Sequence, residues 1–464
     1  MSYAQASWSL GRSARGRILL FAVLAAVPAC SGASGASLGS SEDAGGPGGS
    51  ASEGNTGSSD GGGSPSQGGD ATSSPEAEGG APSGTSADAG PSAPHAPLPQ
   101  FPYGPSPGVD GGAGPLLQAV QIVTATWDKA PTSDPLSTQL DAFGSTLAQS
   151  AWWTSVTADY CGPSAATCVG PGSAPIAHGV GDTPNPNITD SAFTATGNYS
   201  FKKFINDKTT AGDLPVPSAN TLYVFYLPPG FSVVLDGAPT CGYHSLATVN
   251  VLDAGTVTIP YVVIPRCEVS GMQDLDVATV AASREIAEAA TDPYLAQGEI
   301  GFYRVDPAWS VTGNEIGDYC AGLTTTESGS AVQRIWSNAS AAAGHDPCVP
   351  APSGEVYYSV APEADVAQGI TLAVGASATF SATAFADGAT SAWSISAEEL
   401  STATILDVSF DKTSVANGDE VKVTVTLTGA PSATFAGKSY ERFALVSKGA
   451  DGASHSWPVV VYAK

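Results

Sequence analysis

VATVAASREIAEAATDP, the stretch Val277–Pro293, is the part of the chain around which the rest is organised. Its small and apolar residues predict a helix that begins near Asp274, where a carboxylate can cap it, and that Pro293 stops. Arg284 and Glu288 lie four residues apart and therefore share one face of this helix. Because opposite charges at this spacing can pair, the sequence predicts an ion pair on the helix face.

Residues 1–30 are predicted to be a lipoprotein signal peptide. Three arginines precede the apolar run Ile18–Val27, which is too short to span a membrane. The run leads to Cys30, and small residues before a cysteine resemble the lipobox of bacterial lipoproteins, in which this cysteine is lipidated. The alternative is an ordinary signal peptide that is cleaved near the same place. We expect a bacterial cell-envelope protein that contacts the outer membrane or cell surface through its lipid anchor, or one that is secreted.

Residues 31–114 consist mainly of Gly, Ser, Ala and Pro and contain no Lys or Arg. A segment of this composition cannot bury enough apolar surface to offset the entropy that ordering costs. We therefore expect a disordered linker over 31–114 that acts as a flexible tether. The remaining residues, about 115–464, are enough for two domains.

Charge and cysteine content restrict the function classes. The net charge of −26 argues against a nucleic-acid partner, because phosphates need lysine and arginine. Apart from Cys30, six cysteines remain, an even number that suits disulfides in an oxidising compartment. Six cysteines allow 15 pairings, and we expect the pairing of sequence neighbours: Cys161–Cys168, Cys241–Cys267 and Cys320–Cys348.

The ordered part is predicted to hold two domains of different texture. Over 115–350, apolar runs expected to be strands at 116–127, 221–227 and 259–265 alternate with helices expected at 135–160 and 189–207, which predicts an α+β domain. From about residue 352, short alternating segments separated by Gly, Asn, Asp or Pro predict an all-β sandwich of immunoglobulin-like type over 351–464. Glycan binding by this sandwich would rest on analogy of fold alone.

Six segments follow one another in the first of these domains: TLYVFYLPPG, CGYHS, IPYVVIPRC, SREIAEAATDP, NEIGDYC and AVQRIWSN. Together they resemble exported bacterial proteins related to the plant EXORDIUM, or phosphate-induced, family. The resemblance covers about 116–350 and implies a zincin-like fold for this domain.

The resemblance also implies a set of site residues. Relatives read His-Glu where this chain has Arg284 and Glu285, so the resemblance assigns position 284 to a metal ligand and Glu285 to the general base. It assigns Glu288 to a second ligand, and Glu315 or Asp318 to the remaining one. A zinc ion held by such nitrogen and oxygen ligands lowers the pKa of a bound water, which a nearby glutamate can then deprotonate.

Arg284 departs from this pattern at the decisive position, because a guanidinium stays protonated and offers no lone pair to a metal. We expect Arg284 to replace the charge of the metal, so that the acidic residues around it form a structural cluster without a bound cofactor. His244 in CGYHS is expected to be an ordinary loop histidine. Zinc is the alternative, with Glu288, Glu315 and Asp318 as its ligands.

The predicted function is that of a surface-tethered exported lipoprotein with a degenerate, non-catalytic metalloprotease-like domain. Such a protein would act in binding or envelope interaction, with a protein or a glycan as its partner. The alternative is an active zinc metallopeptidase with an altered ligand set.

Overall fold

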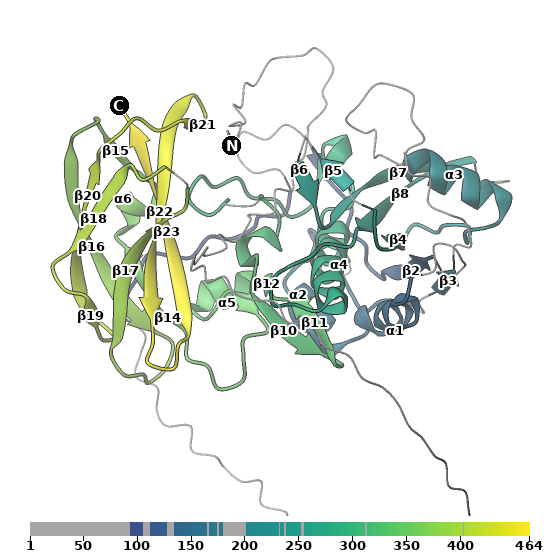
Figure 1. The fold of residues 1–464 in the computed structure, drawn as a ribbon, viewed down its shortest axis with the longest axis horizontal. Helices are drawn as coiled ribbons and strands as arrows, with labels where there is room; N and C mark the ends of the chain where they lie inside the picture. Colours follow the sequence, from purple (N-terminus) through teal and green to yellow (C-terminus); the bar gives the residue numbers. More distant parts are fainter. Residues whose placement is uncertain are drawn as a thin grey trace, which may run out of the picture. The chain divides into compact units, whose positions relative to one another are not determined.

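The computed structural model describes residues 93–464, except for 105–111, 128–133, 165–166, 174–175, 180–200, 232, 236–237, 252–254, 311–312 and 402. The predicted signal peptide, Cys30 and the linker up to residue 92 lie outside the described residues. The described residues belong to one compact unit, in which an α/β region is followed by a β-sandwich (Figure 1). Within this part of the chain, no helix combines the length and the apolar character that crossing a membrane requires.

A five-stranded sheet with the strand order β3-β2-β4-β8-β7 forms the centre of the α/β region. Its strands are β2 (Gln121–Thr126), β3 (Ile176–Gly179), β4 (Thr221–Tyr226), β7 (Tyr243–Val251) and β8 (Gly255–Ile264). The first four in this order are parallel, and β7 runs antiparallel to β8 at the edge. The TLYVFY sequence of β4 is buried along its whole length, as expected for a central strand that is covered on both faces.

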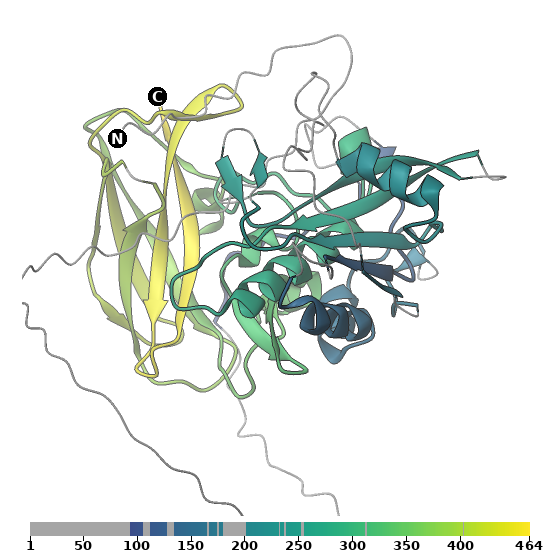
Figure 2. The same ribbon diagram turned by 45° about the vertical axis from the view of Figure 1, so that its right-hand side comes forward.

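Alternating side chains of β4 divide the α/β region into two cores. Leu222 and Val224 belong to one core, and Tyr223 and Phe225 belong to the other, because successive residues of a strand point to opposite faces. Helices cover both faces of the sheet (Figures 1 and 2): α1 (Ser137–Leu147), α2 (Ala151–Thr157) and α4 (Asp274–Thr291) on the side of the first core, and α3 (Phe201–Ala211) on the side of the second.

The helices confirm part of the sequence prediction and correct the rest. The helix expected from Asp274 is confirmed as α4, although Gln273 is its N-cap residue and no side chain makes a capping hydrogen bond. A single helix over 135–160 is wrong, because α1 and α2 are separate. Ser150 begins α2 by accepting a hydrogen bond from the backbone N–H of Trp153, and its extended backbone, with φ −77° and ψ 166°, interrupts the helical run. The helix expected over 189–207 is described only from Phe201 onward and extends to Ala211.

The end of the predicted linker is part of the fold, which corrects the boundary at residue 114. Leu98 and Phe101 are each 2% exposed. The backbone N–H of Phe101 donates to the side-chain oxygen of Asn338, and the Asn338 amide donates back to the Phe101 carbonyl. A short strand β1 (Gly112–Ala113) pairs in parallel with β9 (Glu299–Ile300). Two aromatic rings and a proline-rich context give this segment the apolar surface that the rest of the linker lacks, so the fold begins by Ala93.

Short elements follow α4 and lead to the sandwich: η2 (Leu295–Gln297), η3 (Asp318–Cys320), β10 (Thr324–Glu327), β11 (Ser330–Gln333), β12 (Ile335–Trp336), α5 (Asn338–Ala343) and β13 (Cys348–Val349). A separate hairpin joins β5 (Val233–Leu235) and β6 (Ala238–Thr240) before β7. The disulfides are Cys161–Cys168, Cys241–Cys267 and Cys320–Cys348, which is the neighbour pairing expected from the sequence. Three disulfides are typical of a protein that folds in an oxidising, extracytoplasmic compartment.

The C-terminal region is a two-sheet β-sandwich, as the alternating segments predict. One sheet contains β14 (Tyr358–Pro362), β16 (Ser377–Ala386), β20 (Glu420–Leu427) and β18 (Leu406–Phe410). The other contains β15 (Ile370–Leu372), β23 (Ser454–Ala463), β22 (Lys438–Lys448), β17 (Trp393–Glu399) and β19 (Ser414–Val415), with β21 (Ala433–Phe435) on β22. A short helix, α6 (Ala364–Ala367), follows β14. Valines 421, 423 and 425 of β20 are buried and alternate with more exposed residues, so that one face of this sheet packs into the core.

Candidate functional site

Charged side chains from three separate segments meet beside α4. The helix contributes three of them, β7 contributes one, the loop before η3 contributes one, and the first residue of η3 is the sixth: Arg284, Glu285, Glu288, His244, Glu315 and Asp318. We call this group the charged centre. Each of its side chains is at most 7% exposed. Burial at this level requires that the charges compensate one another or a bound ion.

Arg284 lies among the acidic residues, as the sequence predicts. Its Nη2 donates to Glu285 Oε1 at 2.8 Å, and its Nε is 3.4 Å from Glu288 Oε2. Its Nη1 is 3.9 Å from Asp318 Oδ1. Burial alone would lower the pKa of Arg284, but the carboxylates of Glu288, Glu285 and Asp318 raise it above its usual value. The guanidinium is therefore a fixed positive charge inside the centre.

Both carboxylate oxygens of Glu285 lie against nitrogen atoms of neighbouring side chains. Oε1 accepts from Arg284, and Oε2 lies 3.0 Å from His244 Nδ1. Burial raises the pKa of Glu285, but the opposing effects of Arg284 and His244 together are larger, so that the net shift of this pKa is downward. Glu285 is thus an ionised carboxylate held in place from two sides.

His244 belongs to the charged centre, which corrects its prediction as an ordinary loop residue. It is the second residue of β7 and pairs with Val262 of β8. Its Nδ1 faces Glu285 and its Nε2 lies 3.4 Å from Glu315 Oε1. Burial lowers the pKa of His244, yet Glu315 and Glu285 together raise it well above the usual value. The alternation of small and apolar residues in Tyr243–Val251 was the available signal for a strand, and it gave no indication of what the strand faces.

Other acids at the centre hold their protons more tightly than usual. Burial is the main cause and raises the pKa of Glu288 and of Asp292, a residue that the sequence analysis missed. Burial also raises the pKa of Asp318 to about 6, although Arg284 opposes the shift. Asp292 accepts a hydrogen bond from the backbone N–H of Gly301 at 2.8 Å. The centre therefore has more carboxyl groups than its cations neutralise.

Two of the three expected metal ligands, Glu288 and Glu315, lie close together in the structure, and His244 takes the place of Asp318 beside them. One ligand atom each from His244, Glu288 and Glu315 lie within 4.8 Å of one another. Asp318 instead faces Arg284 and accepts a hydrogen bond from the backbone N–H of Glu315 at 3.0 Å. One imidazole nitrogen and two carboxylate oxygens are a donor set that zinc accepts, so these three residues fit a zinc ion better than the expected all-carboxylate set.

Glycines allow the backbone to approach the charged centre closely. A Cβ on Gly317 would lie 2.6 Å from both Arg284 Cγ and Glu288 Oε1, and a Cβ on Gly313 would lie 2.0 Å from Asp318 Oδ2. The loop that carries Glu315 can therefore pass over α4 only where a residue has no side chain.

Gly317→Ala is expected to destabilise the protein by about 1–3 kcal/mol, because its methyl group overpacks the charged centre. The backbone at Gly317 has φ −80° and ψ −29°, so an alanine meets no conformational barrier and the loss is steric. Gly112→Ala is the matched control, since a Cβ there meets nothing within 4 Å. Chemical denaturation of both variants measures the difference, and equal stabilities would show that the loop yields without cost.

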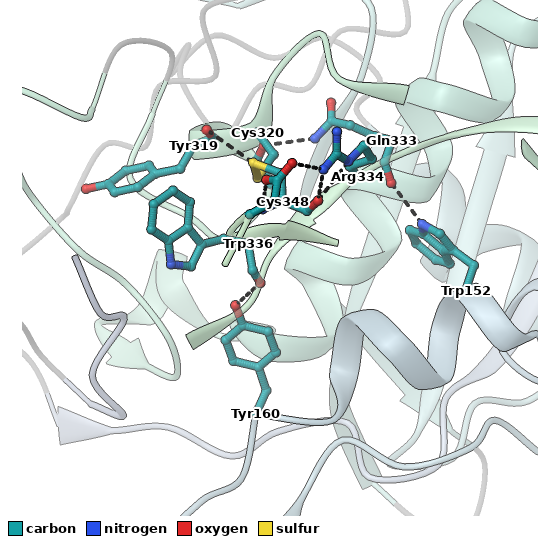
Figure 3. The surroundings of a disulfide bond; sticks show 10 residues. Trp152, Tyr160, Tyr319, Cys320, Gln333, Arg334, Trp336 and Cys348 are labelled. Atoms are coloured by element: carbon teal, nitrogen blue, oxygen red, sulfur yellow. Dashed lines mark hydrogen bonds and ion pairs between the residues drawn. A yellow bond between two sulfur atoms is a disulfide. The ribbon is translucent and has the colours of Figure 1, made fainter. Parts of the chain in front are cut away.

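A disulfide and buried hydrogen bonds hold the loop in place (Figure 3). Cys320, two residues after Asp318, is bonded to Cys348 of β13. The side-chain amide of Gln333 donates to the Gly317 carbonyl at 2.8 Å, and Arg334 Nε donates to the Cys348 carbonyl at 2.7 Å. Figure 3 shows Gln333 and Arg334 beside the Cys320–Cys348 disulfide. The position of the charged loop is thus fixed by structure outside the centre.

A second group of possible ligands lies near the start of the sandwich. It consists of Asp346, Glu355 and His455, whose ligand atoms also lie within 4.8 Å of one another. Arg334 already forms an ion pair with Asp346, and the backbone N–H of Cys348 donates to the other Asp346 oxygen at 2.9 Å. Because its aspartate is already neutralised, this group needs no added cation.

Comparisons with known proteins give no family assignment. No protein-family model and no curated protein matches the chain. Among solved structures, domains 4 and 5 of the S-layer protein SbsC match 24% of this chain at 18% identity and a TM-score of 0.17. The match spans only 53%, about half, of that S-layer chain. The BIgI domain of the beta protein from S. agalactiae, solved bound to CEACAM1, matches 24% of this chain and 97% of its own at 13% identity and a TM-score of 0.15. At these TM-scores, neither similarity supports a conclusion about fold or function.

Proposed function

We propose that this chain is an exported, lipid-anchored bacterial protein whose α/β domain is a zincin-like, EXORDIUM-related fold without peptidase activity, and that it acts by binding at the cell envelope. One observation carries the absence of catalysis. Glu285, the residue in the place of the general base, has both carboxylate oxygens engaged by Arg284 and His244. Each of its oxygens is already engaged by a nitrogen donor, which makes the carboxylate a weaker base toward a water molecule.

The acid–base properties of Glu285 support the same proposal. A general base works best when its pKa lies near the working pH, and enzymes raise the pKa of a catalytic glutamate for this reason. Here Arg284 and His244 outweigh burial and lower the pKa of Glu285. Glu285 holds the side chains of Arg284 and His244 in place, and the histidine that the resemblance implies as a metal ligand at position 284 is absent.

A peptidase assay on the purified full chain tests this proposal. With casein and a fluorogenic peptide library as substrates, we expect no hydrolysis that 1,10-phenanthroline suppresses, with wild type and Glu285→Gln giving equal background. Glu299→Gln, at an exposed residue of β9, is the matched control for loss of a carboxylate. Chelator-sensitive hydrolysis that falls a hundredfold or more in Glu285→Gln alone would overturn the proposal.

An active zinc metallopeptidase is the second candidate function. The convergence of His244 with Glu288 and Glu315 favours it, because these residues can hold zinc without a histidine at position 284. Zinc would supply a polarised water in such an enzyme. If the protein is such an enzyme, Glu285→Gln should abolish its hydrolysis. If it has no peptidase activity, as the engagement of both Glu285 oxygens predicts, Glu285→Gln should leave the background hydrolysis unchanged.

The lipid anchor is tested at Cys30. We expect wild-type protein to sediment with membranes and Cys30→Ala to move to the soluble extracytoplasmic fraction, because a lipidated cysteine supplies the membrane affinity. The three disulfides support export, and they should form in both variants. An unchanged membrane fraction in Cys30→Ala, with no lipid on the wild-type N-terminal peptide by mass spectrometry, would favour the ordinary signal peptide.

A further inference from the structure

Three polar atoms at the charged centre form no hydrogen bond of regular geometry among the described residues: His244 Nε2, Glu288 Oε1 and Glu315 Oε1. The first and the last of them face each other at 3.4 Å. The side chains that carry them are 7%, 1% and 7% exposed. A buried polar atom without a partner costs free energy, and such atoms are rare in folded proteins. Three of them at one place indicate that a ligand belongs there.

The three side chains come close together. One ligand atom from each residue lies within 4.8 Å of the other two, and His244 Nε2 is 3.4 Å from Glu315 Oε1. A tetrahedral zinc ion with bonds of about 2.0–2.1 Å separates its ligand atoms by about 3.3–3.4 Å. The histidine and Glu315 are already at this separation, and a carboxylate oxygen of Glu288 lies within 4.8 Å of both.

The neighbours of the three atoms leave them free for a metal. Arg284 Nε lies 3.4 Å from the other oxygen of Glu288, Oε2, and Oε1 keeps no hydrogen-bond partner among the described residues. Glu285 lies at Nδ1 of His244. When Nδ1 carries the proton and donates it to Glu285, the lone pair of Nε2 points to Glu315 and Glu288. A carboxylate in this position is the usual partner that orients a metal-binding histidine.

We propose that His244 Nε2, Glu288 Oε1 and Glu315 Oε1 hold one zinc ion, with Glu285 as the residue that positions the histidine. Arg284 then lies beside the ion and compensates Glu285 and Asp318, and does not replace the metal. This inference goes beyond the proposed function, which concerns the absence of hydrolysis and makes no claim about a bound metal. Zinc content is measured on the folded protein and hydrolysis on a substrate. Either prediction can therefore fail without the other.

Metal analysis of the purified full chain, with zinc alone as the probe, tests the site. After dialysis against zinc and removal of the excess, we expect one zinc per folded chain by mass spectrometry. Glu315→Gln should weaken zinc binding a hundredfold or more in a calorimetric titration. Glu285→Gln should weaken it about 10–100-fold, the usual effect of losing such a positioning carboxylate.

Two controls separate this site from other sources of zinc. Glu299→Gln removes an exposed carboxylate and should change nothing. His455→Gln removes the histidine of the second group of ligands and should also leave one zinc per chain. Folded wild-type protein without stoichiometric zinc would overturn the proposal, as would zinc that survives Glu315→Gln or is lost only in His455→Gln.

X-ray absorption by zinc in the wild-type protein keeps the test decisive where a variant does not fold. We expect one imidazole nitrogen and two carboxylate oxygens from the protein around the ion. A shell without imidazole, or one with sulfur, would overturn the assignment.

Discussion

Arg284→Met is expected to lower the free energy of unfolding by about 3–5 kcal/mol, the usual loss when one partner of a buried ion pair is removed. The guanidinium hydrogen-bonds to Glu285 and lies close to Glu288 and Asp318. Methionine fills a similar space with no charge, so the variant leaves buried carboxylates without their permanent cation. The loss therefore reports on charge and not on a cavity.

Urea denaturation in the presence of a chelator measures this loss without a contribution from zinc. Arg284→Lys should fall between wild type and Arg284→Met, because it keeps the charge but loses the planar fork that reaches several carboxylates. Lys203→Met is the matched control on a surface pair, since the Lys203 side chain is 58% exposed and pairs with Asp207, and it should change stability by about 0.5 kcal/mol or less. Equal losses in Arg284→Met and Lys203→Met would show that the acids at the centre do not need Arg284.

The elements that the sequence predicts well are those whose pattern is local. TLYVFY is apolar on both faces and becomes the buried central strand β4, and the small and apolar run around Arg284 becomes α4. Short alternating segments give the strands of the sandwich for the same reason, as Glu420–Leu427 illustrates. The pairing of sequence-neighbour cysteines also needs little long-range information. For the helix and the strands, the alternation of buried and exposed positions can be predicted from consecutive residues alone.

The parts of the charged centre that the sequence does not predict depend on register between distant segments. His244 reaches Glu285 because β7 pairs antiparallel with β8 and α4 lies against these strands. Those residues are 41 positions apart, and no local pattern reports which end of β7 meets the helix. Asp292 was missed because it directly follows α4, at a position where an aspartate is expected only to end the helix. The spacing of Arg284 and Glu288, by contrast, fixes their pairing by helix geometry alone.

Removal of the Cys320–Cys348 disulfide by double alanine substitution is expected to cost about 3.5 kcal/mol of stability. Its partners are 28 residues apart in the sequence, and the entropy that a cross-link removes from the unfolded chain grows with the length of the loop that it closes. The Cys161–Cys168 pair, with a separation of 7 residues, is the matched control, and its removal should cost about 2.5 kcal/mol by the same relation. Thermal and urea unfolding of the two double variants measure the order of these losses.

The variant without the Cys320–Cys348 disulfide should also bind zinc more weakly than the variant without Cys161–Cys168. Cys320 ends the segment that carries Glu315 and Asp318, whereas the loop closed by Cys161–Cys168 contributes no residue to the charged centre. Equal zinc affinities in the two variants would mean that the hydrogen bond from Gln333 to Gly317 and the packing on α4 hold this segment without the disulfide.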